Sequence, residues 1–176
     1  MVVMVEPKVI RRSRFESEDI RKLTGYGRRA QLVQQCKLVV YDNGMMELTG
    51  YLEVDPEHPL IQDHFEGDSM LPLSLLGEFV EQTAYIGLAA QKIVGPKKIR
   101  AREMGAKLSE EIRPGNGIVA IVKMPIRPKC RISKIDETEI LFFPDRIEGL
   151  IYRGYSCELI TTRVIGKAWV SAIGLR

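Results

Sequence analysis

The stretch from Leu73 to Val94 constrains the fold most, because it is apolar around nearly its whole circumference and has the length of one long helix. Asp68 or Ser69 can cap its start, and a glycine-proline pair after it predicts its end. At about 1.5 Å per residue the helix would be roughly 30 Å long, about the width of a small domain. A helix with so little polar surface requires other elements around most of it.

The polar residues of this stretch fall on one face of the predicted helix. They are spaced at i, i+4, i+7, i+8 and i+11, and they are Ser74, Glu78, Glu81, Gln82 and Tyr85. The carboxyl groups near the middle exclude a membrane span, since the uncharged part that follows is too short to cross a bilayer. The face is either a solvated stripe or part of a functional site, and for Glu81 the solvated interpretation stays open.

Strand-like segments stand on both sides of this helix. The run from Gln31 to Tyr41 leads into Asp-Asn-Gly at 42–44 and then into the run from Met45 to Val54, which is a strong hairpin signal. Further on, the predicted strands are Ile99–Glu111, Ile118–Met124, Leu150–Ile160 and Lys167–Ile173, with a turn at 164–167. One long apolar helix followed only by strands predicts an α+β fold, with an antiparallel sheet curled around the helix.

Two segments fall outside this pattern. Residues 1–16 have the composition of an extension with little core, and Ser17 begins a short capped helix that ends at Gly25. Residues 125–146 contain three prolines, and we expect an added hairpin there. The sequence therefore predicts an N-terminal extension over 1–16 and a single domain over 17–176.

Length and cysteine content narrow the class of protein. A chain of 176 residues can bury about 70% of its unfolded surface in one domain without a disulfide. The three cysteines, Cys36, Cys130 and Cys157, form no C-x-x-C pair, so the sequence indicates neither a zinc knot nor a disulfide framework. The first ten residues lack the apolar run of a signal peptide. We therefore expect a cytoplasmic protein.

The charge is nearly balanced overall but unevenly distributed. A net charge of +3, from 26 basic and 23 acidic residues, is too small to indicate nucleic-acid binding. Basic residues gather in the first thirty positions and again after the long helix, where Lys98, Arg100 and Arg102 alternate along a predicted strand and would share one face. Such clusters are either a solvated basic surface or a docking patch for an acidic partner or a phosphate.

The turn before the long helix holds His64, a candidate catalytic residue. A lone histidine in a loop is more often a surface or capping residue, so its surroundings decide the interpretation. His64 precedes a helix start whose free N–H groups, such as that of Leu73, can stabilise developing negative charge, and Glu78 follows one turn further on. An imidazole and a carboxyl group near such a helix start are the parts that proton abstraction and elimination require.

The same region offers possible metal ligands, namely His58, Asp63, His64, Glu66 and Asp68. The two histidines are six residues apart, which suits no helical or C-x-x-C-type site. Acids in a loop commonly cap helices and turns. The sequence therefore predicts no metal site.

At these residues the chain resembles the FabZ-type β-hydroxyacyl-(acyl carrier protein) dehydratases, which have the hot-dog fold. The signature of that family runs G-H-F-P-G-x-P-x-M-P-G and continues into a helix that carries a glutamate and A-Q. Residues 63–73 here read Asp-His-Phe-Glu-Gly-Asp-Ser-Met-Leu-Pro-Leu, and the matching positions are His64, Phe65, Gly67, Pro72, Glu78 and Gln82. Weaker similarity at 104–108, 112–116 and 164–168 extends the resemblance over residues 17–173.

The resemblance implies a reaction and an assembly. It implies that a 3-hydroxyacyl thioester, carried by acyl carrier protein or coenzyme A, is dehydrated to the trans-2-enoyl thioester without a cofactor, as in fatty acid biosynthesis. The family's histidine and glutamate meet across a dimer interface, so it also implies a homodimer or a larger even-numbered homo-oligomer. An acyl thioesterase on the same fold and a non-catalytic acyl-thioester-binding module are the alternatives.

The resemblance also implies roles for particular residues. His64 and Glu78 would be catalytic, and the residues that bind substrate would be Phe65, Gly67, Leu73 and Gln82. Leu73 stands where the family has a glycine whose N–H binds the thioester oxygen. Since carrier proteins are typically acidic, the basic residues Lys98, Arg100 and Arg102 would form the docking face.

Overall fold

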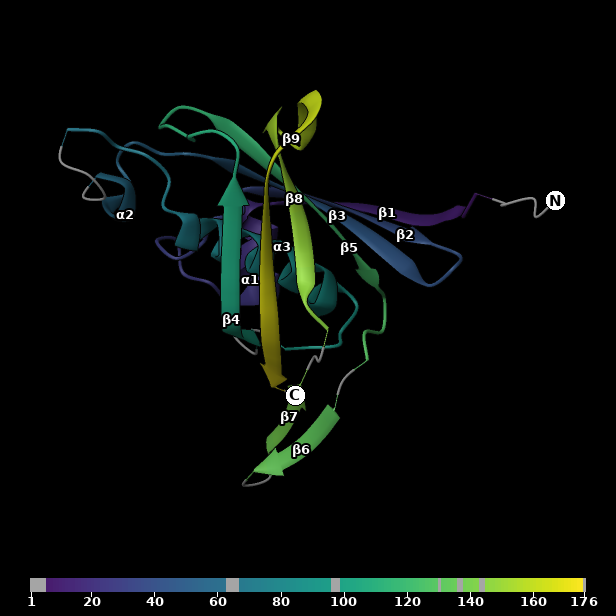
Figure 1. Ribbon diagram of the computed structural model, residues 1–176. Helices are drawn as coiled ribbons and strands as arrows, with labels where there is room; N and C mark the ends of the chain where they lie inside the picture. The colour runs from purple at the N-terminus through teal and green to yellow at the C-terminus, as the bar shows by residue number, and fades with distance from the viewer. Residues whose placement is uncertain are drawn as a thin grey trace.

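The computed structural model describes residues 6–62, 67–95, 99–129, 131–135, 138–142 and 145–175. The helices are α1 (Ser17–Thr24), α2 (Pro59–Gln62) and α3 (Leu73–Ala90). The strands are β1 (Val9–Glu16), β2 (Gln35–Tyr41), β3 (Met45–Glu53), β4 (Ile99–Leu108), β5 (Gly117–Pro125), β6 (Arg131–Ile135), β7 (Thr138–Phe142), β8 (Ile147–Tyr155) and β9 (Glu158–Leu175). Figure 1 shows these elements with α3 at the centre.

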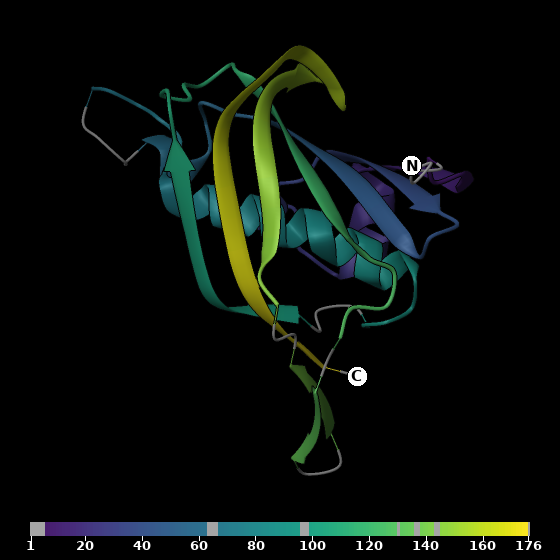
Figure 2. The same cartoon turned by 45° about the vertical axis from the view of Figure 1, so that its right-hand side comes forward.

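The described strands form one antiparallel sheet that curls around α3. The order of strands is β1-β2-β3-β5-β8-β9-β7-β6, and β4 pairs with β9. Figure 2 shows α3 lying across the inner side of the curved sheet, while β6 and β7 project away from it. The predicted α+β architecture, with a sheet wrapped around one long helix, is confirmed.

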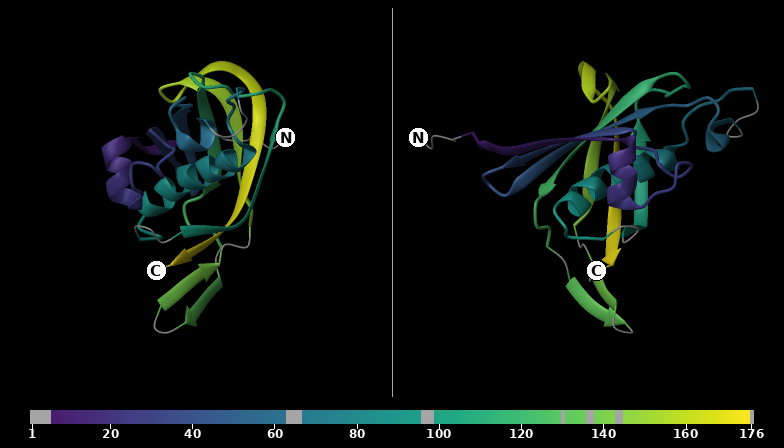
Figure 3. Two further views of the ribbon diagram at one scale, coloured as in Figure 1. Left: turned by 90° about the vertical axis from the view of Figure 1, so that its left-hand side faces the viewer. Right: turned by 180° about the vertical axis from the view of Figure 1, so that it is seen from behind.

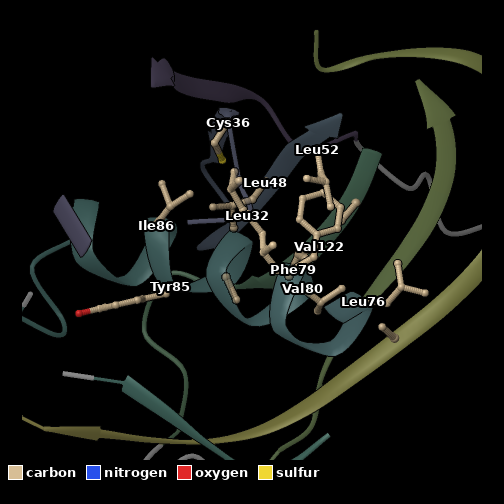
Figure 4. Packing of buried hydrophobic residues seen from close by; sticks show 14 of the residues in the cluster. Leu32, Cys36, Leu48, Leu52, Leu76, Phe79, Val80, Tyr85, Ile86 and Val122 are labelled. Carbon is tan, nitrogen blue, oxygen red and sulfur yellow. The ribbon is translucent and has the colours of Figure 1, made fainter. Parts of the chain in front are cut away.

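The core lies between α3 and the sheet. Phe79, Val80 and Ile86 on α3 are fully buried, and Leu48 of β3 and Val122 of β5 are buried in the same cluster. Figure 4 shows these side chains gathered on the sheet side of the helix. An apolar helix surrounded in this way removes most of its circumference from water, as its composition predicts.

The N-terminus of α3 differs from the prediction. Pro72 occupies the N-cap position with φ −60° and ψ 140°, and no side chain caps the helix. The predicted cap by Asp68 or Ser69 is therefore wrong; the Asp68 carboxylate instead forms an ion pair with Arg113. A proline suits this position because it donates no N–H and its φ is already close to the helical value.

The C-terminus of α3 comes one turn earlier than predicted. The helix ends at Ala90, and Lys92 adopts a left-handed conformation with φ 58°. The Ile93 N–H donates to the Leu88 carbonyl at 2.9 Å, which closes the helix end. The apolar residues Ile93 and Val94 thus pack as a turn, not as a further helical turn.

The β2–β3 hairpin is confirmed at the predicted Asn-Gly. Gly44 has φ 79°, a conformation that favours glycine, and the Met45 N–H donates to the Asn43 side-chain oxygen at 3.0 Å. The strands pair from Val40 opposite Met46 to Gln35 opposite Tyr51.

The C-terminal strands differ from the prediction. The chain turns at Ser156 and Cys157, both with positive φ, and β9 then runs unbroken through the predicted turn at 164–167. Two neighbours hold β9 extended there, since Gly166 pairs with Leu108 of β4 and with Ile151 of β8. Pairing on both sides therefore outweighs the local turn signal.

The N-terminal residues add an edge to the sheet. Strand β1 pairs with β2 and is mostly exposed, while α1 lies beside α3 (Figure 3). Helix α1 begins with a capping box between Glu16 and Asp19, so Glu16 and not Ser17 is its N-cap, and it ends at the predicted Gly25.

The antiparallel β6–β7 hairpin lies within residues 125–146. The division into an extension over 1–16 and one domain stays a prediction.

None of the described helices is long and apolar enough to cross a membrane.

Candidate functional site

Several of the predicted site residues fall outside the described part of the chain. His64 and Phe65 lie in the gap between Gln62 and Gly67, and Lys98 also lies outside the described residues. Arg100 and Arg102 are placed on β4 by their backbone alone. Gly67 is exposed and has φ 74°, as a turn glycine does. The predicted meeting of His64 with Glu78 is therefore not tested.

Glu78 lies in the second turn of α3 and is half-buried. The side-chain amide of Gln82, one helical turn later, donates to the Glu78 carboxylate at 2.8 Å. This hydrogen bond fixes the orientation of a carboxyl group at the edge of the core. Two of the predicted site residues, Glu78 and Gln82, are thus in direct contact.

Gln82 is 1% exposed, and its amide group is shared between α3 and the loop before β2. Its oxygen accepts hydrogen bonds from the N–H groups of Leu32 at 2.7 Å and Val33 at 3.3 Å. Its nitrogen donates to the Ala30 carbonyl at 2.7 Å as well as to Glu78. These contacts use both donors and the acceptor of the amide, so Gln82 fixes the position of loop 30–33 relative to Glu78.

Glu78 faces a cavity of about 340 Å³, which we name the Glu78 hollow. Its polar lining consists of Arg29, His58, Ser74 and Glu78, and its apolar lining consists of Ala30, Leu32, Leu75 and Met104. A carboxyl group, an imidazole and a hydroxyl group beside an apolar wall can transfer protons to and from a bound acyl group.

The wall formed by β4 depends on a glycine. A Cβ atom at Gly77 would lie 3.0 Å from the Cβ and Sδ atoms of Met104, so a larger residue in α3 would force the Met104 side chain to shift by about a few tenths of an ångström. Met104 is 38% exposed and lines the Glu78 hollow from the strand side. The hollow therefore lies directly beside β4, which pairs only with β9 among the described strands.

A second cavity of about 340 Å³ adjoins the first, because Arg29, Leu32 and His58 line both. Its charged lining is mixed: the cations are Arg21, Arg28 and Arg29 and the carboxylates are Glu53, Asp55 and Glu57. Arg21 is already paired with Glu18. With this balance of charges the second cavity extends the space near Glu78 without selecting a sign of ligand charge.

The sequence did not identify all of these residues as parts of one site. His58 was considered only as a metal ligand, yet it lies in the Glu78 hollow and its backbone is held at the start of α2, where the Ile61 N–H donates to its carbonyl at 2.8 Å. Arg29 carried a signal only as one member of the N-terminal basic cluster. Met104 carried none, since no local pattern reveals which strand residue reaches a distant helix.

The polar face of α3 is not a solvated stripe. Glu81 is 3% exposed, and Tyr85 is fully buried. Helix α1 and the segment after it cover this face, with Tyr26 packed edge-on against Tyr85 at a ring distance of 6.0 Å. The solvated interpretation of Glu81 is therefore wrong, because a second layer covers the face that the helical pattern leaves polar.

Leu73 begins α3 and is 50% exposed. Its side chain lines a separate cavity of about 440 Å³, together with Met70, Leu71 and residues 108–112. It does not line the Glu78 hollow of its own chain. The isobutyl group that replaces the hydrogen of a glycine is accommodated in that separate space.

Of the possible metal ligands in the sequence, Asp63, His64 and Glu66 lie outside the described residues, and His58 and Asp68 lie within them. No group of three or more histidine, cysteine or acidic side chains in the described part of the chain is arranged to hold a metal ion. Burial raises the pKa of the Cys157 thiol to about 11 and raises that of Cys36 still further, so both thiols stay protonated at neutral pH. Neither is placed as a nucleophile.

Comparisons with known proteins agree with this architecture. No protein-family model and no curated protein matches the chain. The dehydratase heterocomplex ApeI:P from Xenorhabdus doucetiae is similar in structure, with a TM-score of 0.51 and 9% identity over 88% of this chain and 90% of that one.

Two further solved structures are similar at lower TM-scores. One is an uncharacterized protein from Erwinia carotovora subsp. atroseptica (TM-score 0.48, 14% identity, 96% of each chain). The other is a protein from Silicibacter sp. TM1040 assigned provisionally as a thioesterase (TM-score 0.46, 10% identity, 96% of this chain and 94% of that one). At such identities a similarity shows the fold alone, and the fold that the chain shares with the dehydratase heterocomplex is the predicted hot-dog fold.

Proposed function

We propose that this protein is a dehydratase that converts a 3-hydroxyacyl thioester, carried by acyl carrier protein or coenzyme A, into the trans-2-enoyl thioester. The observation that carries the proposal is the contact between Glu78 and Gln82 in a hollow with an apolar wall. A carboxyl group held by a buried amide is oriented for proton transfer before substrate arrives. The named activity of the ApeI:P complex, a dehydratase on the same fold, supports this choice.

The reaction removes water across one carbon-carbon bond. His64 takes the proton from C2, the electron pair of the C–H bond forms the C2=C3 double bond, and the C3–O bond breaks. Glu78 of the partner chain gives its proton to the departing hydroxyl group, which leaves as water. The N–H of Leu73, at the start of α3, holds the thioester oxygen as negative charge develops there. These steps require no metal or cofactor.

Gln82 has a positioning role in this scheme. Both donors and the acceptor of its amide are used by protein groups, so it acts on the substrate through Glu78. Phe65 and Gly67 would line the substrate path beside His64.

A homodimer would complete the site along β4. This strand pairs only with β9 among the described strands, and its Met104 lines the Glu78 hollow. An edge strand offers unpaired N–H and carbonyl groups to a second copy of the chain. A copy paired along β4 would lie beside the hollow and could contribute its His64. Arg100 and Arg102 belong to β4, and together with Lys98 they are proposed to form the docking face for an acidic carrier.

The proposal is tested by following enoyl absorbance with 3-hydroxybutyryl and longer thioesters. His64→Ala and Glu78→Gln should each lower turnover by about 100- to 10,000-fold, the usual contribution of a general acid or base. Mixing the two inactive variants under conditions of proven subunit exchange should restore activity. In each mixed dimer, one of the two sites would keep both His64 and Glu78. Full activity of His64→Ala would refute the assignment.

The same assay separates the alternatives. Release of free thiol without enoyl formation would identify a thioesterase. Saturable thioester binding without any turnover would identify a binding module.

A further inference from the structure

A further hollow lies where the chain leaves the sheet for the β6–β7 hairpin, and it shares no residue with the Glu78 hollow. Strands β5 and β8 pair from Ile118 opposite Arg153 to Val122 opposite Gly149, and their pairing stops there. Beyond this point β5 continues to Pro125, and β8 begins at Ile147. Figure 2 shows the chain leaving β5 for the hairpin, which projects below the sheet. The two diverging strands enclose a cavity of about 330 Å³, which we name the basic hollow.

The charged side chains that line the basic hollow are mostly positive. The cations are Lys123, Arg127, Lys129 and Arg146, and the lining contains a single carboxylate, that of Asp145. The mixed cavity next to Glu78, by contrast, has equal numbers of arginines and carboxylates. A cavity with four cations and one carboxylate concentrates positive potential and favours an anionic ligand.

Two of these cations have partners that keep them in place. Lys123 pairs with Glu47 at 3.1 Å, and the contact raises the pKa of its ammonium group. Arg146 lies 3.9 Å from Glu103 and 6.0 Å from the centre of the Trp169 ring. Arg127 and Lys129 form no ion pair with any residue that the structure describes. The hollow therefore has two anchored cations and two whose charge no described carboxylate neutralises.

The backbone around the hollow is well held, and its floor is apolar. The Ile126 N–H donates to the Gly44 carbonyl at 2.9 Å, which ties the end of β5 to the β2–β3 turn. Pro125 and Pro128 restrict the backbone on either side of Arg127. Met124 and Ile147, both buried, line the hollow together with the cations. A ligand that fits must place an anionic group at the rim and a less polar part against this floor.

We propose that the basic hollow binds a small organic phosphate. Arginine presents a planar fork of N–H groups that matches phosphate oxygens, and lysine adds a compact positive charge. The volume lies at the lower end of the range for small-molecule sites, so the ligand is of about nucleotide size. This site lies outside the proposed dehydratase site and does not depend on it.

The experiment uses Trp169, the one tryptophan of the sequence, as a built-in reporter. Its ring lies next to Arg146, so a phosphate bound at that guanidinium should change its fluorescence. The full-length protein is titrated with ADP, with adenosine and with inorganic phosphate at constant ionic strength. ADP should give a saturable change, inorganic phosphate a weaker one, and adenosine none. Equal affinity for ADP and inorganic phosphate, or no saturation with ADP, would overturn the proposal of an organic phosphate.

Two double variants locate the binding. Arg127→Gln with Lys129→Gln should weaken ADP binding about 100-fold or more, because two charge-assisted hydrogen bonds to the phosphate are lost. The matched control is Arg11→Gln with Arg12→Gln, which removes the same charge from the exposed strand β1 and should leave ADP affinity unchanged. Equal weakening by both pairs would show general charge attraction and refute a site.

Discussion

The two halves of α3 are packed inside the same sheet but bury different chemistry. In the second half, from Thr83 to Ala90, most of the buried side chains are apolar, as Ile86 and Leu88 are. In the first half, Glu81 and Gln82 are buried as deeply as the aliphatic residues beside them. A buried polar group costs free energy unless it is hydrogen-bonded, and Gln82 meets this condition with partners in a loop about fifty residues away. This difference supports our proposal that the first half of α3 carries the site, while the second half contributes mainly to stability.

The largest expected effect tests the first half. Glu78→Gln should lower kcat/KM for the dehydration by about 100- to 10,000-fold while the melting temperature stays close to that of the wild type, since the amide keeps the shape of the side chain. Steady-state kinetics and thermal melts measure the two quantities. Glu57→Gln, the same change at an exposed carboxylate of the adjoining cavity, is the control and should leave kcat/KM unchanged.

The second half should show the opposite response. Ile86 is fully buried, so Ile86→Ala should lower the free energy of unfolding by about 2–5 kcal/mol through lost burial and a remaining cavity. The folded fraction should keep its kcat/KM. Urea unfolding measures the loss, and Ile10→Ala on the exposed part of β1 is the control. A loss of activity in fully folded Ile86→Ala would break the division of α3 into two halves.

A change at Gln82 should lower both the activity and the stability of the protein. Gln82→Ala leaves the N–H of Leu32 and the carbonyl of Ala30 without their partner, which should cost about 1–3 kcal/mol of stability. It should also lower kcat, because Glu78 loses its orienting amide. Gln34→Ala, which removes exposed hydrogen bonds to the backbone of Glu53, should do neither. Unchanged kcat in folded Gln82→Ala would separate the buried amide from the reaction.

Leu73 should show the smallest effect. Its side chain lines a different cavity, so Leu73→Gly should leave kcat/KM for short thioesters nearly unchanged. Stability should fall by about 1 kcal/mol, the usual difference between glycine and a good helix former. A large gain in kcat/KM would instead mean that the leucine restricts the site in the assembled enzyme.

Much of the fold follows from local patterns. The apolar circumference of Leu73–Val94 is sufficient to predict a central helix with strands around it, and Asn43-Gly44 locates a hairpin. The local signal at 164–167 failed, because β9 is held extended there by strands on both sides. Local turn chemistry was outweighed by pairing partners that are distant in the sequence.

The candidate site also combines features that follow from local sequence spacing with features that depend on tertiary contacts. The helical spacing alone brings Glu78 and Gln82 onto one face, since residues four apart are neighbours on any helix. Tertiary structure decided that Gln82 also holds loop 30–33, that Glu81 is covered, and that His58 and Met104 reach the Glu78 hollow. The divergence of β5 and β8 that opens the basic hollow is likewise visible only in the folded sheet. Periodicity along a chain reports which residues share a face, but only packing between distant segments determines what that face contacts.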